Sequence, residues 1–466
     1  MAKTFFKQFY LGCLSHASYL LGSDGMGIVV DPQRDVDLYI EEAARQELEI
    51  RYVFETHLHA DFVSGHRELA QRTGARIVVG ERAGARFEHH AAREGDIFEV
   101  GALEVRVIET PGHTPESISI LVTDTSDPQA APKLFTGDTL FVGDVGRPDL
   151  AGTVGFSPAE MAAMMYDTIH EKLLRLDDRV LVYPAHVAGS LCGRNISQET
   201  WSTIGAQRRE NYALKPMRKD EFVAMMTLGL PEAPAYFSKD AAMNREGALP
   251  LSKHPVPALD AAETATLIQS GSLLLDVRPS EIYAPEHIRG SLNIGLDGQF
   301  ASWAGTLLDF QRPVIVLAEN AHDVGQAVLR LARVGFSQVR GALKGGIEAW
   351  KDAGFPTASI EQFDVERFAR LLSERSGELQ VLDVRRPTEI ASGAIPHAVR
   401  IALDRLPECI DELDRTRPVY ALCASGYRSS VAASLLEAAG FDAVSIDGGI
   451  NAYREAGYEL FEAVPA

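Results

Sequence analysis

The sequence predicts an α/β multidomain protein. Three observations indicate this fold class: the chain has 466 residues, strand-like and helical runs alternate along it, and its second half contains a duplication. A chain of this length exceeds what one hydrophobic core usually organises, so we expect several domains. Hydrophobic residues make up 46% and charged residues 24%, which is the composition of a folded globular protein.

The charge and composition of the chain argue against nucleic acid and membranes as binding partners. The net charge of -20 opposes broad binding to nucleic acid, because that interaction depends on clustered Lys and Arg. No apolar run approaches the ~20 residues that span a bilayer, and the first residues lack a signal-peptide core. The cysteines are scattered rather than arranged as a disulfide scaffold: Cys13, Cys192, Cys409 and Cys423. We therefore expect a cytoplasmic protein that binds neither nucleic acid nor membranes.

In the N-terminal region, strand-like runs such as residues 75–80 ("ARIVVG") and 118–124 ("ISILVTD") alternate with a few helical runs, and histidines and aspartates cluster where strand-like runs end. Folds of the α/β class place their chemistry where strands end. We expect the following side chains, which come after strand-like runs, to meet at one edge of a sheet: His57, His59, Asp61, His113, Asp138 and His186.

These residue types indicate a transition-metal site. Imidazole and carboxylate ligands together suit Zn, Fe or Mn, and two histidines with one carboxylate are the ligand set of non-haem Fe(II) oxygenases. The stretch "THLHADF" ends at Phe62, where a dinuclear hydrolase needs a further imidazole. The sequence therefore favours one metal ion over two.

A proline-rich stretch after residue 230 has no sustained helical or strand period, and we predict a linker over residues 236–258. Beyond it, "LLLDVRPSEI" from Leu273 recurs as "QVLDVRRPTEI" from Gln380. A period of roughly 105 residues is too long for a solenoid, so each copy is predicted to be one small domain with a parallel sheet covered by helices. The predicted domains on either side of the linker are residues 1–235, 259–358 and 362–466.

The second copy carries a candidate nucleophile in "ALCASGYRSS". Cys423 lies directly after a predicted strand and before a predicted helix, and Gly426 permits a tight loop between them. Such a loop points backbone N–H groups inward and, with the cation of Arg428, would stabilise a thiolate or the persulfide formed on it. We expect Ser425 and Gly426 to contact the substrate.

The first copy lacks this chemistry. When Pro313 is aligned with Pro418, Ala318 stands opposite Cys423 and Asp323 stands opposite Arg428. Alanine cannot hold sulfur covalently, and an acidic residue repels an anionic substrate. We expect this copy to serve as a spacer, as a docking module or as a dimerisation module.

Residues 1 to about 225 resemble the metallo-β-lactamase fold, and specifically the persulfide dioxygenases of the ethylmalonic-encephalopathy type. The motifs that carry the resemblance are "THLHAD", "ETPGHTPES", "FTGDTLFVGDVGRPDL" and "STIGAQRRENYAL". The resemblance implies an αββα fold and one Fe(II) per chain, held by His57, His113 and Asp138. It places His59, Asp61 and His186 around these ligands and suggests that Arg147 contacts the substrate, although an ion pair with Asp149 competes for that side chain.

Residues 362–466 resemble a rhodanese sulfurtransferase domain through "LDVRRPTEI", "IDGGINAY" and the loop from Cys423 to Arg428. His397 and Arg400 depart from the usual pattern, which leaves the sulfur acceptor open. The first copy resembles an inactive rhodanese domain.

Together the resemblances imply a fusion that oxidises a thiol persulfide, such as glutathione persulfide, with O2 to sulfite and transfers sulfane sulfur among persulfide, sulfite and thiosulfate in sulfide detoxification. Two alternatives stay open: a single-zinc thioester or lactone hydrolase of the same fold, and a sulfur-relay scaffold that oxidises nothing. The carrier thiol and association into a homo-oligomer are also open.

Overall fold

The computed structural model describes residues 4–150, 155–230, 232–251, 256–375 and 377–461. The chain divides into two compact units. Unit 1 comprises Met1–Lys253 with Ala332–Gly335, and unit 2 comprises His254–Leu331 with Phe336–Ala466. Among the described residues, no helix combines the length and the apolar character needed to cross a membrane.

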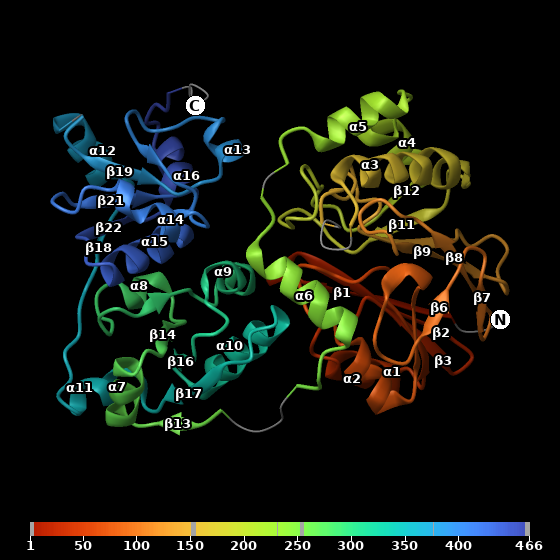
Figure 1. Cartoon of the computed structure of the whole chain (residues 1–466), viewed down its shortest axis with the longest axis horizontal. Coiled ribbons are helices and arrows are strands. Elements are labelled where there is room, and N and C mark those ends of the chain that lie inside the picture. The colour runs from red at the N-terminus through yellow and green to blue at the C-terminus, as the bar shows by residue number, and fades with distance from the viewer. Residues whose placement is uncertain (1–3, 151–154, 231, 252–255, 376, 462–466) are drawn as a thin grey trace. The chain divides into compact units, whose positions relative to one another are not determined.

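Unit 1 contains two six-stranded sheets (Figure 1). The first has the order β1 (Thr4–Leu11), β2 (His16–Ser23), β3 (Met26–Val30), β4 (Glu49–Phe54), β5 (Arg76–Gly80), β6 (His90–Ala92). The second has the order β12 (Ser202–Thr203), β11 (Leu181–Pro184), β10 (Lys133–Gly137), β9 (Ile118–Asp124), β8 (Leu103–Glu109), β7 (Ile97–Val100). Helices flank the sheets: α1 (Asp37–Arg45), α2 (His66–Thr73), α3 (Pro158–Asp167), α4 (Ile204–Glu210), α5 (Lys219–Thr227) and α6 (Ala235–Glu246).

Side-chain alternation along the strands explains why the two sheets are sandwiched between helices. In β10, Phe135 joins the core between the sheets, whereas Leu134 joins the core under α3, α4 and α5. Val53 of β4 packs with α1 and α2, while its neighbour Phe54 faces the other sheet. A period of two in side-chain direction therefore fills three apolar layers. The predicted αββα fold is confirmed.

The predicted linker over residues 236–258 is wrong in its first part. Residues 235–246 form α6, which belongs to unit 1 and buries Tyr236, Phe237, Asp240 and Asn244. The buried face of α6 includes two polar residues, so the sequence shows no apolar period there. Helices tolerate proline at their start, and Pro234 directly precedes this one. Residues 252–255 of the segment lie outside the described part of the chain.

Unit 2 contains two five-stranded sheets whose pairings are parallel. The first copy has the order β13 (Ala258–Leu259), β17 (Val339–Leu343), β16 (Val314–Leu317), β14 (Leu273–Asp276), β15 (Leu292–Asn293). The second has the same order in β18 (Glu361–Phe363), β22 (Ala443–Ile446), β21 (Val419–Leu422), β19 (Gln380–Asp383), β20 (Val399–Arg400). The shared order shows that the sequence duplication is a duplication of fold.

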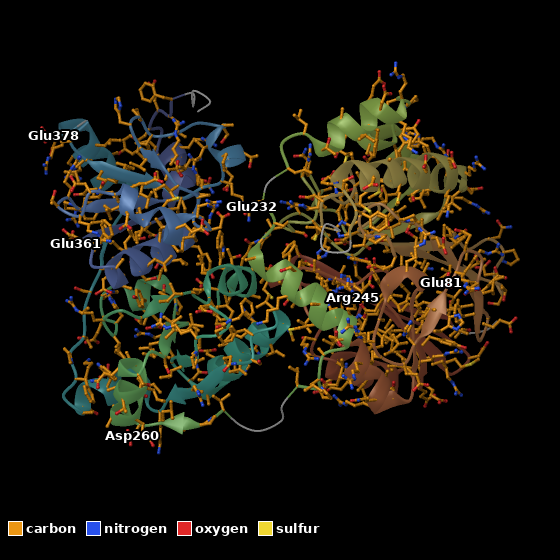
Figure 2. The ribbon with its side chains drawn as sticks, in the orientation of Figure 1. Glu81, Glu232, Arg245, Asp260, Glu361 and Glu378 are labelled. Carbon is orange, nitrogen blue, oxygen red and sulfur yellow. The ribbon has the colours of Figure 1, made fainter. Side chains whose placement is uncertain are left out.

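The helices of the two copies also correspond. Those of the first copy are α7 (Ala261–Gln269), α8 (Ser280–Tyr283), α9 (Phe300–Leu307), α10 (Ala321–Arg333) and α11 (Gly346–Asp352). Those of the second are α12 (Val365–Glu374), α13 (Pro387–Ile390), α14 (Leu406–Cys409), α15 (Tyr427–Ala438) and α16 (Gly449–Glu455). Asp260, labelled in Figure 2, caps α7 by accepting a hydrogen bond from the backbone N–H of Glu263. Asp364 caps α12 in the same way, because a carboxylate satisfies an otherwise unpaired N–H of the first turn.

Candidate metal centre and candidate cysteine loop

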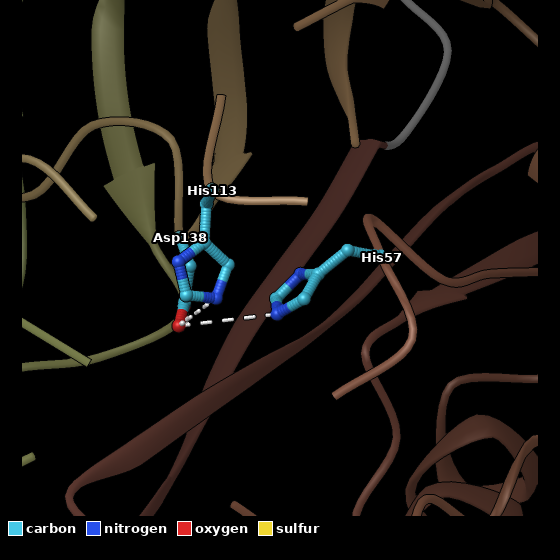
Figure 3. Close-up of side chains that lie close together, drawn as sticks. All are labelled: His57, His113 and Asp138. Carbon is cyan, nitrogen blue, oxygen red and sulfur yellow. Dashed lines mark ion pairs between the residues drawn. The ribbon is translucent and has the colours of Figure 1, made fainter. Parts of the chain in front are cut away.

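His57, His113 and Asp138 come together at the ends of three strands (Figure 3). His57 follows β4, His113 follows β8 and Asp138 directly follows β10. Asp138 Oδ2 lies 3.9 Å from His57 Nε2 and 3.5 Å from His113 Nε2. All three side chains are buried. The structure thus assembles the two-histidine, one-carboxylate set that the sequence predicts.

The donor atoms of this triad are available for a metal ion. Among the described residues, His57 Nε2 and both carboxylate oxygens of Asp138 have no hydrogen-bond partner. The Nδ1 of His113 lies 2.9 Å from the carbonyl oxygen of Arg147, to which it donates, and its Nε2 faces Asp138. Buried polar atoms without partners are rare, so the set fits a bound cation.

A chain of hydrogen bonds fixes the other histidine in the same tautomer. Thr56 Oγ1 donates to Asp31 Oδ2 at 2.9 Å and lies 3.0 Å from His57 Nδ1. Because the hydroxyl proton is already used, Thr56 accepts from Nδ1–H. The lone pair of His57 Nε2 is therefore left for the metal.

The electrostatics of the triad also suit a cation. Burial, and next the neighbouring His59, lowers the pKa of His57 well below its ordinary value, and burial lowers the pKa of His113 to about 4. Both imidazoles are consequently neutral near pH 7, which is the form that binds metals. Burial and then the charge of Asp61 raise the pKa of Asp138 well above its usual range. A bound divalent cation would offset that shift and keep the carboxylate ionised.

The turn of Gly146 and Arg147 brings the ligands close together. A Cβ at Gly146 would lie 2.0 Å from the Asp138 carbonyl oxygen and 3.0 Å from His113 Nδ1, so a side chain does not fit there. The guanidinium of Arg147 is buried and contacts Asp149 through Nε–Oδ1 at 2.7 Å and Nη2–Oδ2 at 2.6 Å. Arg147 therefore forms the ion pair with Asp149 that was the competing interpretation of this side chain. A contact between Arg147 and the substrate stays a prediction.

His59, Asp61 and His186 form a second group beside the triad. His186 Nε2 lies 3.3 Å from Asp61 Oδ2 and 3.5 Å from Asp138 Oδ1. His59 Nε2 instead faces Asp31 Oδ1 at 3.3 Å. The fully buried ring of Phe62 occupies the space next to this group, with its centroid 4.4 Å from that of His59. His186 joins this group to the triad through Asp138, and the donor atoms of the group are themselves close enough together to hold an ion, so the predicted supporting role of these residues stays a prediction.

Sequence reasoning missed His16 and left Cys192 open. His16 is buried, its Nε2 lies 3.0 Å from the backbone carbonyl oxygen of Asp31, and its ring centroid lies 4.2 Å from that of Phe62. Cys192 is buried, and its Sγ belongs with Asp138 and His186 to a third group of close donor atoms. The signal for His16 was a histidine at the start of a buried strand, but no local pattern tied it to residues far along the chain.

Asn244 of α6 is a further residue that the sequence did not single out. Its amide nitrogen donates to the carbonyl oxygens of His59 at 2.7 Å and Phe62 at 2.8 Å, and its oxygen accepts from the N–H of Ser64 at 2.8 Å. One buried side chain therefore satisfies three backbone groups of the loop that follows His57. Such a loop would otherwise carry unpaired polar groups into the protein interior.

The cysteine loop lies in unit 2, between β21 and α15. Cys423 is buried at the end of β21, and Gly426 adopts φ 101°, a conformation that favours glycine. The N–H of Gly426 donates to Cys423 Sγ at 3.1 Å, and Ser429 Oγ lies 3.7 Å from the same sulfur. Ser425 is exposed at the rim of the loop. This geometry can stabilise a thiolate at Cys423.

The first copy has the same local frame without the chemistry. Ala318 follows β16 as Cys423 follows β21, and it is buried. Asp323 lies in the first turn of α10, where its carboxylate accepts from Asn320 Nδ2 at 2.8 Å. A negative charge at a helix N-terminus is favourable, so Asp323 supports the helix at the position where the second copy has a cation.

Comparisons with known proteins agree with this division. Residues 11–186 match the metallo-beta-lactamase superfamily, and residues 260–353 and 365–456 each match the rhodanese-like domain. A crystal structure of a metallo-beta-lactamase from Staphylococcus aureus is 33% identical, covers 73% of this chain and 98% of its own, and superposes with a TM-score of 0.65.

Curated relatives of this chain include proteins named as dioxygenases and proteins named as hydrolases. The mitochondrial persulfide dioxygenase ETHE1 of Bos taurus is 30% identical over 224 residues, which are 46% of this chain and 78% of the relative. A probable metallo-hydrolase of Burkholderia pseudomallei is 31% identical over 248 residues, 45% of this chain and 81% of the relative. Sequence identity to these relatives therefore does not decide whether this chain catalyses an oxidation or a hydrolysis.

Proposed function

We propose that this chain, which belongs to the metallo-β-lactamase superfamily and carries two rhodanese-like domains after that fold, is a persulfide dioxygenase with sulfurtransferase activity. The proposed oxidation is R–S–SH + O2 + H2O → R–SH + SO3²⁻ + 2 H⁺, with glutathione persulfide as the substrate. The proposed transfer moves sulfane sulfur from a second persulfide to Cys423, releasing R–SH, and then to sulfite, releasing thiosulfate. The role of such a protein is sulfide detoxification.

The observation that carries the oxidation is the ligand set of His57, His113 and Asp138, whose buried donor atoms face one point. When bound, one ferrous ion with three protein ligands offers open coordination positions at which persulfide and O2 are brought together. Two histidines and one carboxylate also form catalytic zinc sites in hydrolases, so the metal content has to be measured to separate the two chemistries.

The residues around the triad hold and orient these ligands. The carbonyl of Arg147 and the hydroxyl of Thr56 keep both imidazoles in the tautomer that presents Nε2. The buried ring of Phe62 excludes water from the side of His59. Asn244 secures the loop between His59 and Ser64, so that the position of His57 does not depend on a mobile segment.

The single-metal hydrolase remains the second candidate, because the triad of two histidines and one carboxylate also suits one zinc ion and a probable metallo-hydrolase has a similar sequence identity to this chain. The test is anaerobic purification, iron and zinc quantification, and O2 uptake with persulfides of glutathione, coenzyme A and cysteine. We expect about one iron per chain and persulfide-dependent O2 uptake. Thioester hydrolysis by a zinc-loaded protein without O2 uptake would support the hydrolase, and persulfide binding with neither reaction would support a sulfur-relay scaffold.

A further inference from the structure

The first rhodanese-like copy, which has no cysteine at its loop, contacts the helix that carries the catalytic loop of the second. The contacts lie on one face of α15, at Tyr427, Ser430, Ser434 and Glu437, which are spaced by three or four residues. The two copies also share one hydrophobic core, in which Leu292 and Ile294 of the first copy pack with Val431 and Ala432 of α15.

Asn293 is the centre of the polar part of this contact. Its Oδ1 accepts from Ser430 Oγ at 3.1 Å, and its backbone N–H donates to Ser434 Oγ at 3.0 Å. Its Nδ2 donates to the carbonyl oxygens of Asp276 and Arg278 in its own copy, at 3.0 and 2.9 Å. Asn293, Ser430 and Ser434 are buried. Removing one of these hydrogen bonds would therefore leave a buried polar group with neither a protein partner nor water to bind, which is destabilising.

Tyr427 brings the same contact to the catalytic loop itself. Tyr427 directly follows Gly426, and the backbone N–H of Gly426 donates a hydrogen bond to Cys423 Sγ. The Tyr427 hydroxyl donates to the carbonyl oxygen of Gly295 at 2.8 Å. A Cβ at Gly298 would lie 2.4 to 2.7 Å from three ring atoms of Tyr427, so the first copy fits closely around this ring.

The position in the first copy that corresponds to Tyr427 is not enclosed by a neighbour. His322 occupies the position in α10 that corresponds to Tyr427 when Pro313 is aligned with Pro418, and it is exposed. The copy that retains the nucleophile is thus the one whose loop is held by its neighbour.

We infer that the first copy is a positioning element for the sulfur-transfer site, acting from Asn293, Gly295 and Gly298 on Tyr427 and thereby on the loop that holds Cys423. Tyr427 is a positioning residue in this proposal, and the part that concerns sulfur transfer rests on the function proposed above. The inference assigns a task to a domain that has lost its own nucleophile, and it requires no ligand in that domain.

The test changes only the first copy, in the full chain. Gly298→Ala adds a methyl group against the Tyr427 ring, whereas Gly325→Ala in α10 adds one where no heavy atom lies within 4 Å. Neither glycine has a positive φ, so backbone strain does not separate the two variants. The readouts are the pH profile of Cys423 alkylation by iodoacetamide, resolved by peptide mass spectrometry, and the kcat and KM of thiosulfate formation.

For Gly298→Ala we expect a changed alkylation profile and a fall in kcat of about ten- to a hundredfold, because small displacements of a reacting group are costly. Gly325→Ala should match the unchanged protein in both readouts. In a Tyr427→Ala background, Gly298→Ala should have no further effect, since the ring that it displaces is gone. Unchanged Cys423 reactivity in Gly298→Ala, or effects that simply add in the double variant, would overturn the inference. If the unchanged protein transfers no sulfur, the proposed function fails, and the alkylation profile still decides the positioning role.

Discussion

Arg428 and Glu389 form a two-armed ion pair, with 2.7 Å from Nη1 to Oε2 and 2.6 Å from Nη2 to Oε1. The sequence assigned Arg428 the task of supplying a cation to the sulfur-binding loop, and the structure gives that cation a fixed carboxylate partner. The guanidinium is largely buried, so the pair restricts its position. The charge that an anionic sulfur compound meets at this loop therefore depends on both side chains.

The first prediction concerns this pair. Arg428→Met should raise the KM for persulfide or thiosulfate by about tenfold or more, because Glu389 is left as an unpaired negative charge near the loop. Arg428→Met combined with Glu389→Gln should recover part of that loss. Steady-state sulfurtransferase assays measure both effects. A double variant that is no better than Arg428→Met alone would contradict the repulsion argument.

The second prediction concerns the number of metal ions. The unchanged protein should retain one tightly bound metal per chain, and Phe62→His should raise the metal content toward two, because it adds an imidazole next to His59 in the group of His59, Asp61 and His186. Metal analysis after dialysis measures this. Adding Asp61→Ala to Phe62→His should return the content to one. Two tightly bound metals in the unchanged, active protein would show that Phe62 does not prevent the second site.

The third prediction concerns Asp138. Asp138→Asn keeps the shape of the side chain but removes the only anionic ligand of the triad, so iron retention and O2 uptake should both be lost. Burial and the charge of Asp61 raise the pKa of Asp138 in the metal-free protein, so metal binding should release a proton and its affinity should rise with pH. Calorimetry in two buffers of different ionisation enthalpy measures the released proton, and Asp138→Asn should release fewer. Full O2 uptake by Asp138→Asn would mean that the ligands are misassigned.

The fourth prediction concerns the first rhodanese-like copy. In a Cys423→Ser background, Ala318→Cys should remain inactive, because Asp323 lies where the second copy has Arg428 and a thiol needs a lowered pKa to accept sulfur. Adding Asp323→Arg tests whether a cation is enough to restore transfer. Sulfurtransferase activity from Ala318→Cys alone would refute the electrostatic part of this explanation.

The fifth prediction concerns how the two sites divide the products. The unchanged protein should release thiosulfate as well as sulfite, and Cys423→Ser should release sulfite alone, because a serine hydroxyl cannot carry a persulfide. Oxygen uptake should change little, since the triad and Cys423 belong to different compact units. Thiol-reactive labelling of products beside an oxygen electrode measures both. Thiosulfate that persists after correction for the spontaneous reaction of sulfite with persulfide would exclude Cys423 as the carrier, and a collapse of O2 uptake would show that the sites are coupled.

The sequence predicted those parts of the site that follow from local pattern. His57, His113 and Asp138 each follow an apolar strand, and parallel or neighbouring strands bring such positions to one edge. Cys423 and Gly426 were recognisable because a strand, a tight loop and a helix are adjacent in sequence.

The parts that the sequence did not predict depend on contacts between distant segments. Asn244 meets the backbone of His59 across 185 positions, and His16 meets the carbonyl of Ala185 across 169. The α6 helix was missed because its buried face includes Asp240 and Asn244, so its burial is not marked by an apolar period. Glu389 lies 39 positions from Arg428, and the spacing of the two residues gives no sign of the pair.

The imidazole and carboxylate donors of the triad have a consequence for how the protein acquires its metal. Such donors bind zinc more tightly than ferrous iron, so affinity alone does not select iron. The metal that fills the site is then set by the supply at the time of folding. Cells grown with excess zinc should yield a stable, correctly folded protein that consumes no oxygen, and growth on iron-enriched, zinc-depleted medium should yield the oxidising form from the same gene.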